Sequence, residues 1–310
     1  MVKHLLAIVV VMLIWGCETR QSRLESFLLK GNEEVINGNK EKGLYYFNEA
    51  LKLDSCFADA LSRSALLYVD AHMYADGIKN FSKAIECEPG RLSLWNGRAF
   101  SYYQSGDYYN SLNDADQAIK LAPDSAMAYF ARGMALSKLA KHEDAIAAFG
   151  QALQHGFPSE LECRINIATS KISLKKLDEA KAELDACLKI DDKHPLIYNS
   201  LALIDVEKNE FNAALMEVNK AIELDSRHPY FINNRGFIEI QLGKLEEAEE
   251  DINQSIVMDP SNSWAYRNKG LLELKKKNFD EAERLLKKAK GMDPNTERVD
   301  EYLSQIPKKK

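Results

Sequence analysis

The hexapeptide AIKLAP at residues 118–123 decides the fold, because close variants of it recur along the chain. AIECEP stands 34 residues before it, and SIVMDP (255–260) and AKGMDP (289–294) are again 34 residues apart. Self-similarity at a fixed period of this length is typical of stacked arrays of small structural units. The 310 residues would ordinarily suggest two domains, but the period predicts one repeat array instead.

A 34-residue period places eight copies between residues 24 and 296, with one extra residue, Glu160, between the fourth and the fifth. The copies begin at Leu24, Ala58, Leu92, Ala126, Leu161, Pro195, Pro229 and Ser263. Their eighth, twentieth and twenty-seventh positions hold only Gly, Ala, Ser or Cys. Small side chains let two helix backbones approach closely, and the apolar residues between them follow helical spacing. Each copy is therefore predicted to be a pair of antiparallel helices.

Two stretches carry most of the pattern of a known family: WNGRAFSYYQSGDYYNSLNDADQAIKLAP (95–123) and INNRGFIEIQLGKLEEAEEDINQSIVMDP (232–260). In them the chain resembles the tetratricopeptide repeat (TPR) family. The resemblance covers residues 24–296 and implies an all-α, right-handed α-solenoid of about eight helix pairs. It also implies a concave face lined by the first helix of each pair.

The pattern weakens near the extra residue, where the fourth copy ends HGFPSE and the fifth has Lys171 in place of the usual aromatic residue. We expect a bend or a weaker interface there, dividing the array into repeats 1–4 (24–159) and repeats 5–8 (160–296). In the last segment, 297–310, one helical face holds Val299, Tyr302, Leu303 and Ile306. This segment is predicted to be a capping helix with a basic tail, because each repeat contacts only its neighbours.

The start of the chain predicts export. A short basic end precedes the apolar run Leu5–Ile14, which is about half the length of a membrane span. The end of this run, Ile14-Trp15-Gly16-Cys17, resembles the lipobox of bacterial lipoproteins. The resemblance implies removal of the signal peptide 1–16 and acylation of Cys17, followed by a tether over 17–23. The alternative is an ordinary signal peptide with a coincidental cysteine.

Composition and motifs argue against several functional classes. The formal net charge is −6 and no basic stripe occurs, so nucleic acid is not an expected partner. The sequence has no His-Glu-x-x-His, Gly-rich phosphate loop or Gly-x-Ser-x-Gly motif. We therefore expect no catalytic residues, no metal site and no cofactor.

Four bases at seventh positions are predicted to be structural: Arg98, Arg132, Arg235 and Lys269. Eighteen residues before each of them, in the preceding copy, stand Asn80, Asp114, Glu217 and Asp251. We expect each base to bridge its own first helix to the second helix of the preceding repeat through these residues.

The cysteines beyond Cys17 leave two alternatives open. Cys56 with Cys87, and Cys163 with Cys187, lie at matching ends of predicted helix pairs, so an exported chain could form two disulfides. The other alternative is that all four stay reduced, with Cys187 filling a small-residue position.

The predicted concave face takes its lining from the second, fifth, sixth, ninth, twelfth and thirteenth positions of the copies. The candidate groove residues are Asn96, Phe100, Tyr103, Phe130, Met134, Asn199, Tyr230, Asn233, Asn234, Phe237, Trp264, Arg267 and Asn268, with Gln104, Met127, Gln241 and Lys275 beside them. Asn amides can bond a peptide backbone, and aromatic residues with Arg are favoured at interface hot spots.

These residues predict a non-enzymatic scaffold or adaptor that binds a peptide or protein partner in the groove. The predicted place is the cell envelope, lipid-anchored at the periplasmic face of the outer membrane, in envelope assembly, secretion or the organisation of cell-wall enzymes. The alternative is a periplasmic carrier that holds a small ligand, such as a cell-wall fragment, between Phe237, Trp264 and Arg267.

Overall fold

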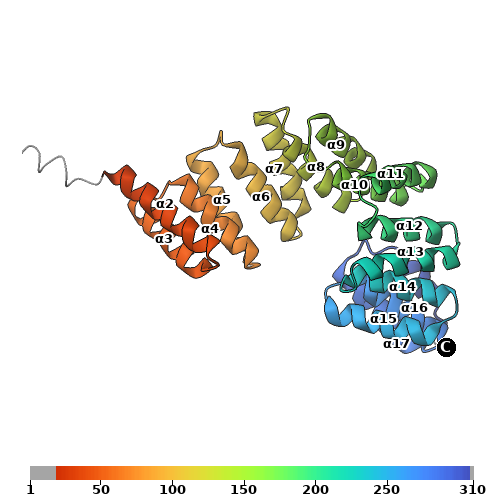
Figure 1. Cartoon of the computed structure of the whole chain (residues 1–310). Coiled ribbons are helices and arrows are strands. Elements are labelled where there is room, and N and C mark those ends of the chain that lie inside the picture. The colour runs from red at the N-terminus through yellow and green to blue at the C-terminus, as the bar shows by residue number, and fades with distance from the viewer. Residues whose placement is uncertain (1–18, 308–310) are drawn as a thin grey trace, which may run out of the picture. The chain divides into compact units, whose positions relative to one another are not determined.

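A computed structural model describes residues 19–307, and these form helices without strands. The helices follow one another as antiparallel pairs (Figure 1), which confirms the predicted all-α solenoid. The chain divides between Pro158 and Ser159 into two compact units. The predicted signal peptide and Cys17 lie outside the described residues, and the predicted bend between repeats 4 and 5 stays a prediction.

The bounds of the helices follow the 34-residue period. The first unit contains α2 (Arg20–Ile36), α3 (Lys40–Leu53), α4 (Ala58–Asp70), α5 (Tyr74–Cys87), α6 (Leu92–Gln104), α7 (Tyr108–Leu121), α8 (Ala126–Lys138) and α9 (His142–Gln154). The second contains α10 (Glu160–Ser173), α11 (Leu177–Ile190), α12 (Pro195–Glu207), α13 (Phe211–Leu224), α14 (Pro229–Gln241), α15 (Leu245–Met258), α16 (Ser263–Lys275), α17 (Phe279–Met292) and α18 (Val299–Ser304). None of the helices between residues 19 and 307 is long and apolar enough to cross a membrane.

The first helix begins earlier than predicted. Residues 20–23, assigned to the tether, form the first turn of α2. The reason is Thr19, whose side chain accepts a hydrogen bond from the backbone N–H of Ser22 at 3.1 Å and so caps the helix. Any tether is correspondingly shorter.

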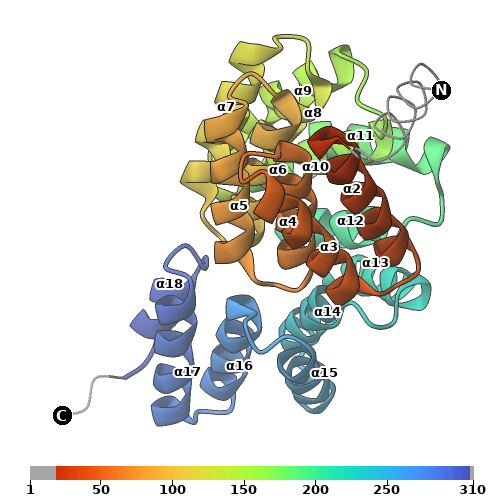
Figure 2. The ribbon, with the colours of Figure 1, turned by 90° about the vertical axis from the view of Figure 1, so that its left-hand side faces the viewer.

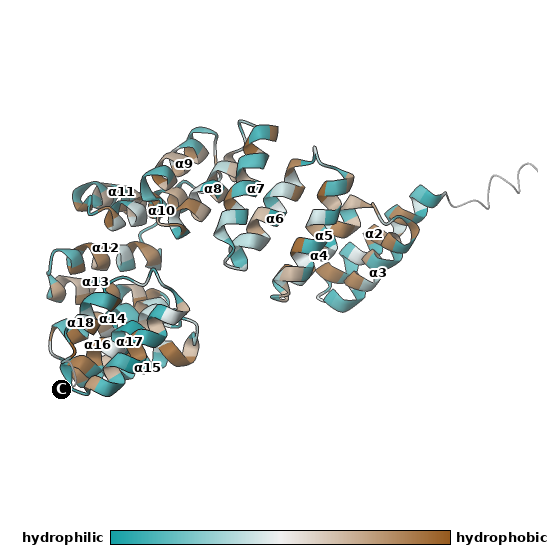
Figure 3. Ribbon diagram, turned by 180° about the vertical axis from the view of Figure 1, so that it is seen from behind, coloured by the Kyte–Doolittle hydropathy of each residue, from teal (hydrophilic) through white to brown (hydrophobic). Residues whose placement is uncertain are grey.

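The small residues at the eighth position lie where two helices of a repeat cross. A Cβ atom added to Gly133 would lie 2.7 Å from the ring of Phe149, and one added to Gly270 would lie 2.7 Å from Leu286. Phe47, Phe81 and Phe149 fill the same row of the second helices and are fully buried. Hydrophobic and hydrophilic residues are mixed along the helices (Figure 3), and the buried apolar residues form clusters that join neighbouring helices.

The turn inside each repeat requires a left-handed backbone at the fifteenth position. Glycine supplies it in several copies, as at Gly38 and Gly106 (φ 83° in both), and Asn209 supplies it at φ 61°. The same geometry recurs at every turn between a first and a second helix, although some copies place His, Ala or Lys there. The fifteenth position thus takes the left-handed backbone conformation even where its residue does not favour that conformation.

At the C-terminal end, α18 packs against α16 and α17 (Figure 2). Val299 and Tyr302 are buried in the same core cluster as Leu272 and Leu286, and Leu303 and Ile306 pack against it partly buried. This apolar face covers the last complete repeat.

The four basic residues at seventh positions (Arg98, Arg132, Arg235 and Lys269), which we call the base ladder, join repeats, but through residues other than those predicted. Arg98 makes its ion pair within its own repeat, with Asp114 at 2.7 Å. Arg132 reaches back to Asp116 at 2.9 Å, and Lys269 to Asn253 at 2.7 Å, sixteen residues earlier in each case. Arg235 pairs with Asp251 at 2.6 Å and reaches back to Asn219 at 3.3 Å, just as Arg98 also reaches back to Ser82 at 3.0 Å. The predicted spacing of eighteen residues is therefore wrong.

The physical reason is helical phase. Side chains that are two positions apart on an α-helix point in nearly opposite directions, because each residue turns the helix by about 100°. On α7, Asp114 therefore faces back to Arg98 on α6, and Asp116 faces forward to Arg132 on α8. One second helix in this way holds both of its neighbouring first helices.

Candidate functional site

The first-helix face of the first unit keeps large apolar side chains exposed. Leu66, Phe100 and Met134 occupy the ninth positions of α4, α6 and α8, and the first two are 43% and 48% exposed while Met134 is half-buried. Met127 on α8 is also exposed. Successive first helices contact one another, so the ninth positions form one row across α4, α6 and α8, and Met127 lies seven residues before Met134 on α8. We call these four side chains the apolar stripe (Leu66, Phe100, Met127 and Met134).

The other candidates on this face are partly covered. The Tyr103 ring lies 5.5 Å from that of Tyr108, and Phe130 stacks on Phe157 with ring centroids 4.2 Å apart. Asn96 is half-buried, and its side-chain oxygen has no hydrogen-bond partner among the described residues. The structure thus brings together all the candidates of the first unit on α6 and α8.

The corresponding face of the second unit is closed by its own side chains. Asn234 donates a hydrogen bond to Asn199 Oδ1 at 2.8 Å, and Asn268 donates to Asn233 Oδ1 at 2.9 Å. Both bonds join neighbouring first helices, linking α12 to α14 and α14 to α16. Asn199, Asn233 and Asn268 are buried. Their amides therefore hold the repeats together.

Arg267 is buried in the same row, with 6% of its surface exposed. It donates to Asn268 Oδ1 at 2.7 Å, and its guanidinium lies 4.5 Å from the ring centroid of Trp264 and 5.3 Å from that of Phe237. Desolvation lowers its pKa to about 10. The ring faces thus hold an internal cation.

These contacts correct the predicted groove. Asn199, Asn233 and Phe237 do not line an open surface, because side chains of the next first helix cover them, and Arg267 and Asn268 are themselves buried. The space proposed for a small ligand between two aromatic rings is occupied by Arg267 itself. In the second unit Tyr230 stays exposed, while Asn234 and Trp264 are half-buried.

The two cysteine pairs behave differently. Cys56 and Cys87 form a disulfide with their Cα atoms 5.6 Å apart, whereas Cys163 and Cys187 are free and buried. Cys187 packs in one cluster with Ile197, the third residue of the next repeat. Third and twenty-seventh positions thus meet between repeats rather than within one, so the predicted second disulfide is wrong. Burial raises the pKa of Cys163 to about 12 and that of Cys187 to about 11, which keeps both thiols protonated.

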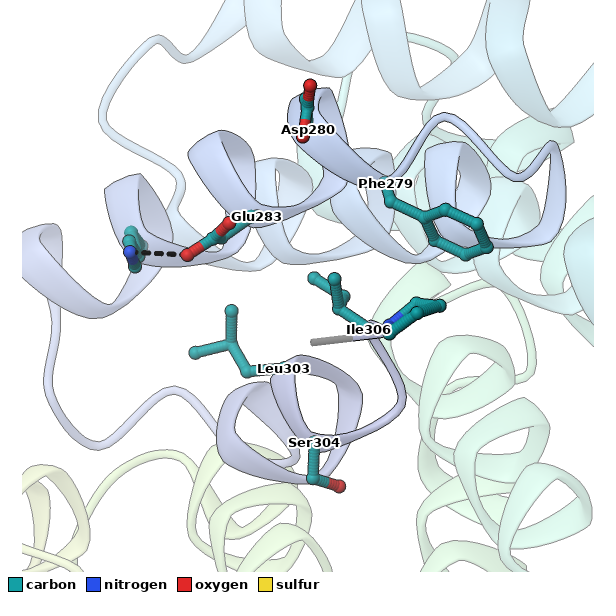
Figure 4. A pocket seen from close by; sticks show the side chains of 8 residues that line it. Phe279, Asp280, Glu283, Leu303, Ser304 and Ile306 are labelled. Atoms are coloured by element: carbon teal, nitrogen blue, oxygen red, sulfur yellow. Dashed lines mark hydrogen bonds and ion pairs between the residues drawn. The ribbon is translucent and has the colours of Figure 1, made fainter. Parts of the chain in front are cut away.

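A cleft of about 730 Å³ lies between α17 and α18, and the sequence did not predict it. Phe279, Leu303 and Ile306 line it (Figure 4), and Glu283 on its rim is paired with Lys287. It arises because α18 has 6 residues where α16 has 13, so the chain leaves α17 early at Pro307. No interaction on its walls indicates a ligand class.

Between residues 19 and 307, no group of three or more His, Cys, Asp or Glu side chains could hold a metal ion. One buried carboxyl is perturbed: desolvation raises the pKa of Glu239 to about 7, and the charge of Asp251 adds to the rise. Glu239 lies in the packed interior of a repeat and not in a cleft, so its raised pKa affects the stability of the fold.

Comparison with known proteins supports the same reading of the repeats. Models of the tetratricopeptide repeat match residues 136–204 in one case, and residues 97–160 and 235–296 in another, together more than half of the chain. Tetratricopeptide repeat protein 28 of Mus musculus is 28% identical over 122 residues, covering 39% of this chain but 5% of that protein. Small glutamine-rich tetratricopeptide repeat-containing protein 2 of Mycosarcoma maydis is 27% identical over 129 residues, 42% of this chain and 36% of that protein. This chain therefore spans only a small part of these relatives.

Solved structures agree in fold. A tetratricopeptide repeat protein from Parabacteroides merdae superposes with a TM-score of 0.65 at 18% identity, covering 80% of this chain and 98% of that one. A chain of the APC/C hetero-tetramer Cut9-Hcn1 superposes with a TM-score of 0.63 at 14% identity, covering 88% of this chain and 55% of that one. With its repeated small positions, helix pairs and matched models, this chain belongs to the tetratricopeptide repeat family.

Proposed function

We propose that this chain is a lipid-anchored scaffold of the bacterial cell envelope that binds a peptide or protein segment on the apolar stripe of its first unit. Tetratricopeptide repeat proteins serve as protein–protein interaction scaffolds and are generally non-catalytic. The observation that carries the proposal is the exposed row at Leu66 and Phe100, continued by the half-buried Met134. Exposed apolar side chains gathered on neighbouring helices are a feature of protein interaction sites.

The cysteines support the proposed compartment. Disulfides persist in oxidising compartments such as the periplasm and are rare in the cytosol. Cys56, which is exposed, and Cys87 form a disulfide that joins the loop before the second repeat to the last residue of α5. This bond fits an exported chain and supports reading residues 1–16 as an export signal.

Replacement of Cys17 by serine is expected to abolish acylation. If Cys17 becomes the acylated first residue, labelled palmitate will appear on the wild-type chain and not on Cys17→Ser. The anchored chain should also sediment with membranes, because two or more acyl chains give stable anchoring. Cys87→Ser serves as the control, since it removes another cysteine without touching the signal. Equal labelling of wild type and Cys17→Ser would rule out the anchor.

Loss of the apolar stripe is expected to remove the partner. We predict that Leu66→Ser/Phe100→Ser/Met127→Ser leaves the fold intact, because all three side chains are exposed. Proteins crosslinked to the tagged full-length chain in its own host should include at least one that the triple variant loses. Removing three exposed apolar contacts from a bound partner should weaken binding at least about 100-fold.

The control replaces three apolar residues on second helices that are more exposed than those of the apolar stripe. Tyr109, Met216 and Val257 are 71%, 74% and 79% exposed. Tyr109→Ser/Met216→Ser/Val257→Ser should retain every captured protein. A capture profile that is the same for both triple variants would show that the apolar stripe is not the binding surface.

A further inference from the structure

One repeat of the first unit is closed by a covalent bond. Cys56 lies in the loop between α3 and α4, and Cys87 is the last residue of α5. The two cysteines are 31 positions apart in the sequence, and their disulfide spans the second repeat from before its first helix to the end of its second. The bond therefore limits how far α4 and α5 can separate.

The helix pair can form without this bond, as the neighbouring repeat shows. In the third repeat the equivalent positions hold Gly90 and Leu121, yet α6 and α7 have 13 and 14 residues, as α4 and α5 do. The third, fourth, sixth, seventh and eighth copies contain no cysteine. Helix packing alone thus suffices for the pair, and the disulfide adds a constraint that a reductant can remove.

The cysteines between residues 19 and 307 differ in their access to a thiol reagent. Cys56 is exposed and Cys87 is half-buried. Cys163 and Cys187 are free and fully buried, and burial raises their pKa values to about 12 and 11, so their thiols stay protonated and unreactive. Among these residues, a reductant therefore changes a single covalent link.

The segments beside the disulfide also hold the neighbouring repeats. Arg20 on α2 donates a hydrogen bond to the backbone oxygen of Leu53, the last residue before the first loop, at 2.6 Å. Trp95 on α6 donates to the backbone oxygen of Pro89, two residues after Cys87, at 2.9 Å. Because each repeat contacts only its neighbours, a loosened second repeat uncouples the first repeat from the third.

We propose that the Cys56–Cys87 bond is a redox switch of the second repeat, opened by a dithiol that attacks Cys56. A thiolate of the dithiol bonds to Cys56 Sγ, the disulfide breaks, and its electron pair leaves with Cys87 Sγ, which takes a proton from water. The second thiolate of the dithiol then attacks the mixed disulfide and releases Cys56. Two electrons pass to the protein, and the dithiol becomes a disulfide. The inference does not rest on the proposed function, although α4 also carries Leu66 of the apolar stripe.

Reduction of the full-length chain tests the site of attack. After brief treatment with dithiothreitol, iodoacetamide should label Cys56 and Cys87 of the native chain, as peptide mass spectrometry shows. The buried Cys163 and Cys187 should stay unlabelled. With the monothiol mercaptoethanol, quenched by N-ethylmaleimide, the mixed disulfide should be found on Cys56 and the maleimide on Cys87. The reverse distribution would overturn attack at Cys56.

Hydrogen exchange tests the consequence for the second repeat. Reduction should speed exchange of the α4 and α5 amides at least about 10-fold, because the disulfide restricts the opened state of the loop that it closes. The amides of α12 and α13, which belong to a repeat without cysteine, are the internal control and should be unchanged. Cys56→Ser/Cys87→Ser should exchange at the reduced rate with or without dithiothreitol.

Three outcomes of these measurements would overturn the switch. The first is equal exchange of α4 and α5 in the oxidised and the reduced chain. The second is equal acceleration at α12 and α13, because the effect would then not belong to the second repeat. The third is a chain isolated from oxidising medium with Cys56 and Cys87 unbonded. None of the measurements uses a partner, so the test of the apolar stripe stays independent of them.

Discussion

Replacement of Arg98 by alanine is expected to lower the unfolding free energy of the third repeat by about 3–5 kcal/mol. The guanidinium donates two hydrogen bonds to Asp114, at 2.7 and 2.9 Å, and the Asp114 side chain is only 1% exposed. Without Arg98 that carboxylate stays buried with no counter-ion. An uncompensated buried charge costs far more than the intact pair contributes, which is why the expected effect is large. Native-state hydrogen exchange of the α6 and α7 amides measures it locally.

Two variants control this prediction. Arg132 makes the same kind of bond to Asp116, but the two side chains are 31% and 44% exposed, so Arg132→Ala should cost about 0–1 kcal/mol. Arg98→Met combined with Asp114→Leu removes both charges and should recover most of the loss. Similar losses in Arg98→Ala and Arg132→Ala would mean that burial does not set the strength of these pairs.

Replacement of Glu239 by glutamine is expected to remove a pH dependence of about 3 kcal/mol. Glu239 is 8% exposed, and its Oε2 atom has no hydrogen-bond partner among the described residues. Burial raises its pKa from 4.5 to about 7, and the charge of Asp251 adds to this. A difference of this size between folded and unfolded states corresponds to about 3 kcal/mol.

The direction follows from which state holds the proton. Below pH 4.5 the carboxyl of Glu239 is protonated in both states, so it costs nothing. As the pH rises toward 7 the unfolded chain ionises first, so stability falls, and above about pH 7 the loss is constant. Wild type should therefore lose about 3 kcal/mol more than Glu239→Gln between pH 4 and pH 8.

The measurement is urea unfolding of both chains at the two pH values, followed by hydrogen exchange of the α14 amides. Burial also raises the pKa values of Asp205 and Glu217, and these act in the same direction. Both are present in both chains, so they cancel in the difference. An identical pH dependence in wild type and Glu239→Gln would contradict the raised pKa.

Much of the fold could be predicted because its rules are local to each repeat. The small residue opposite a large one, as at Gly133 and Phe149, fixes how two helices cross whichever repeat it occupies. The partners of the base ladder could not be read from the same alignment. A spacing of sixteen residues between base and partner can be told from one of eighteen only when it is known which side of α7 faces α8. The period gives the position of a residue in its repeat but not the direction of its side chain.

The candidate site divides in the same way. In the sequence, the first helices of all copies place the same positions on the predicted concave face, so the same groove is predicted for both units. The structure leaves Phe100 exposed and buries its equivalent Phe237. Arg267, on the next first helix, covers Phe237.

By itself, the sequence determined the family, the register of the repeats and the positions that face a neighbouring first helix, because all three follow from a 34-residue period. Only the tertiary structure decided which of these positions are open. At the sixth position α6 and α8 have Gly97 and Ala131, which are too short to reach the preceding first helix. The second unit has Asn234 and Asn268, which reach across and bond it. The burial of Asn199 and Asn233 thus depends on a side chain 35 residues later, and that of Phe237 on Arg267, 30 residues later, and only the packed helices bring these residues into contact.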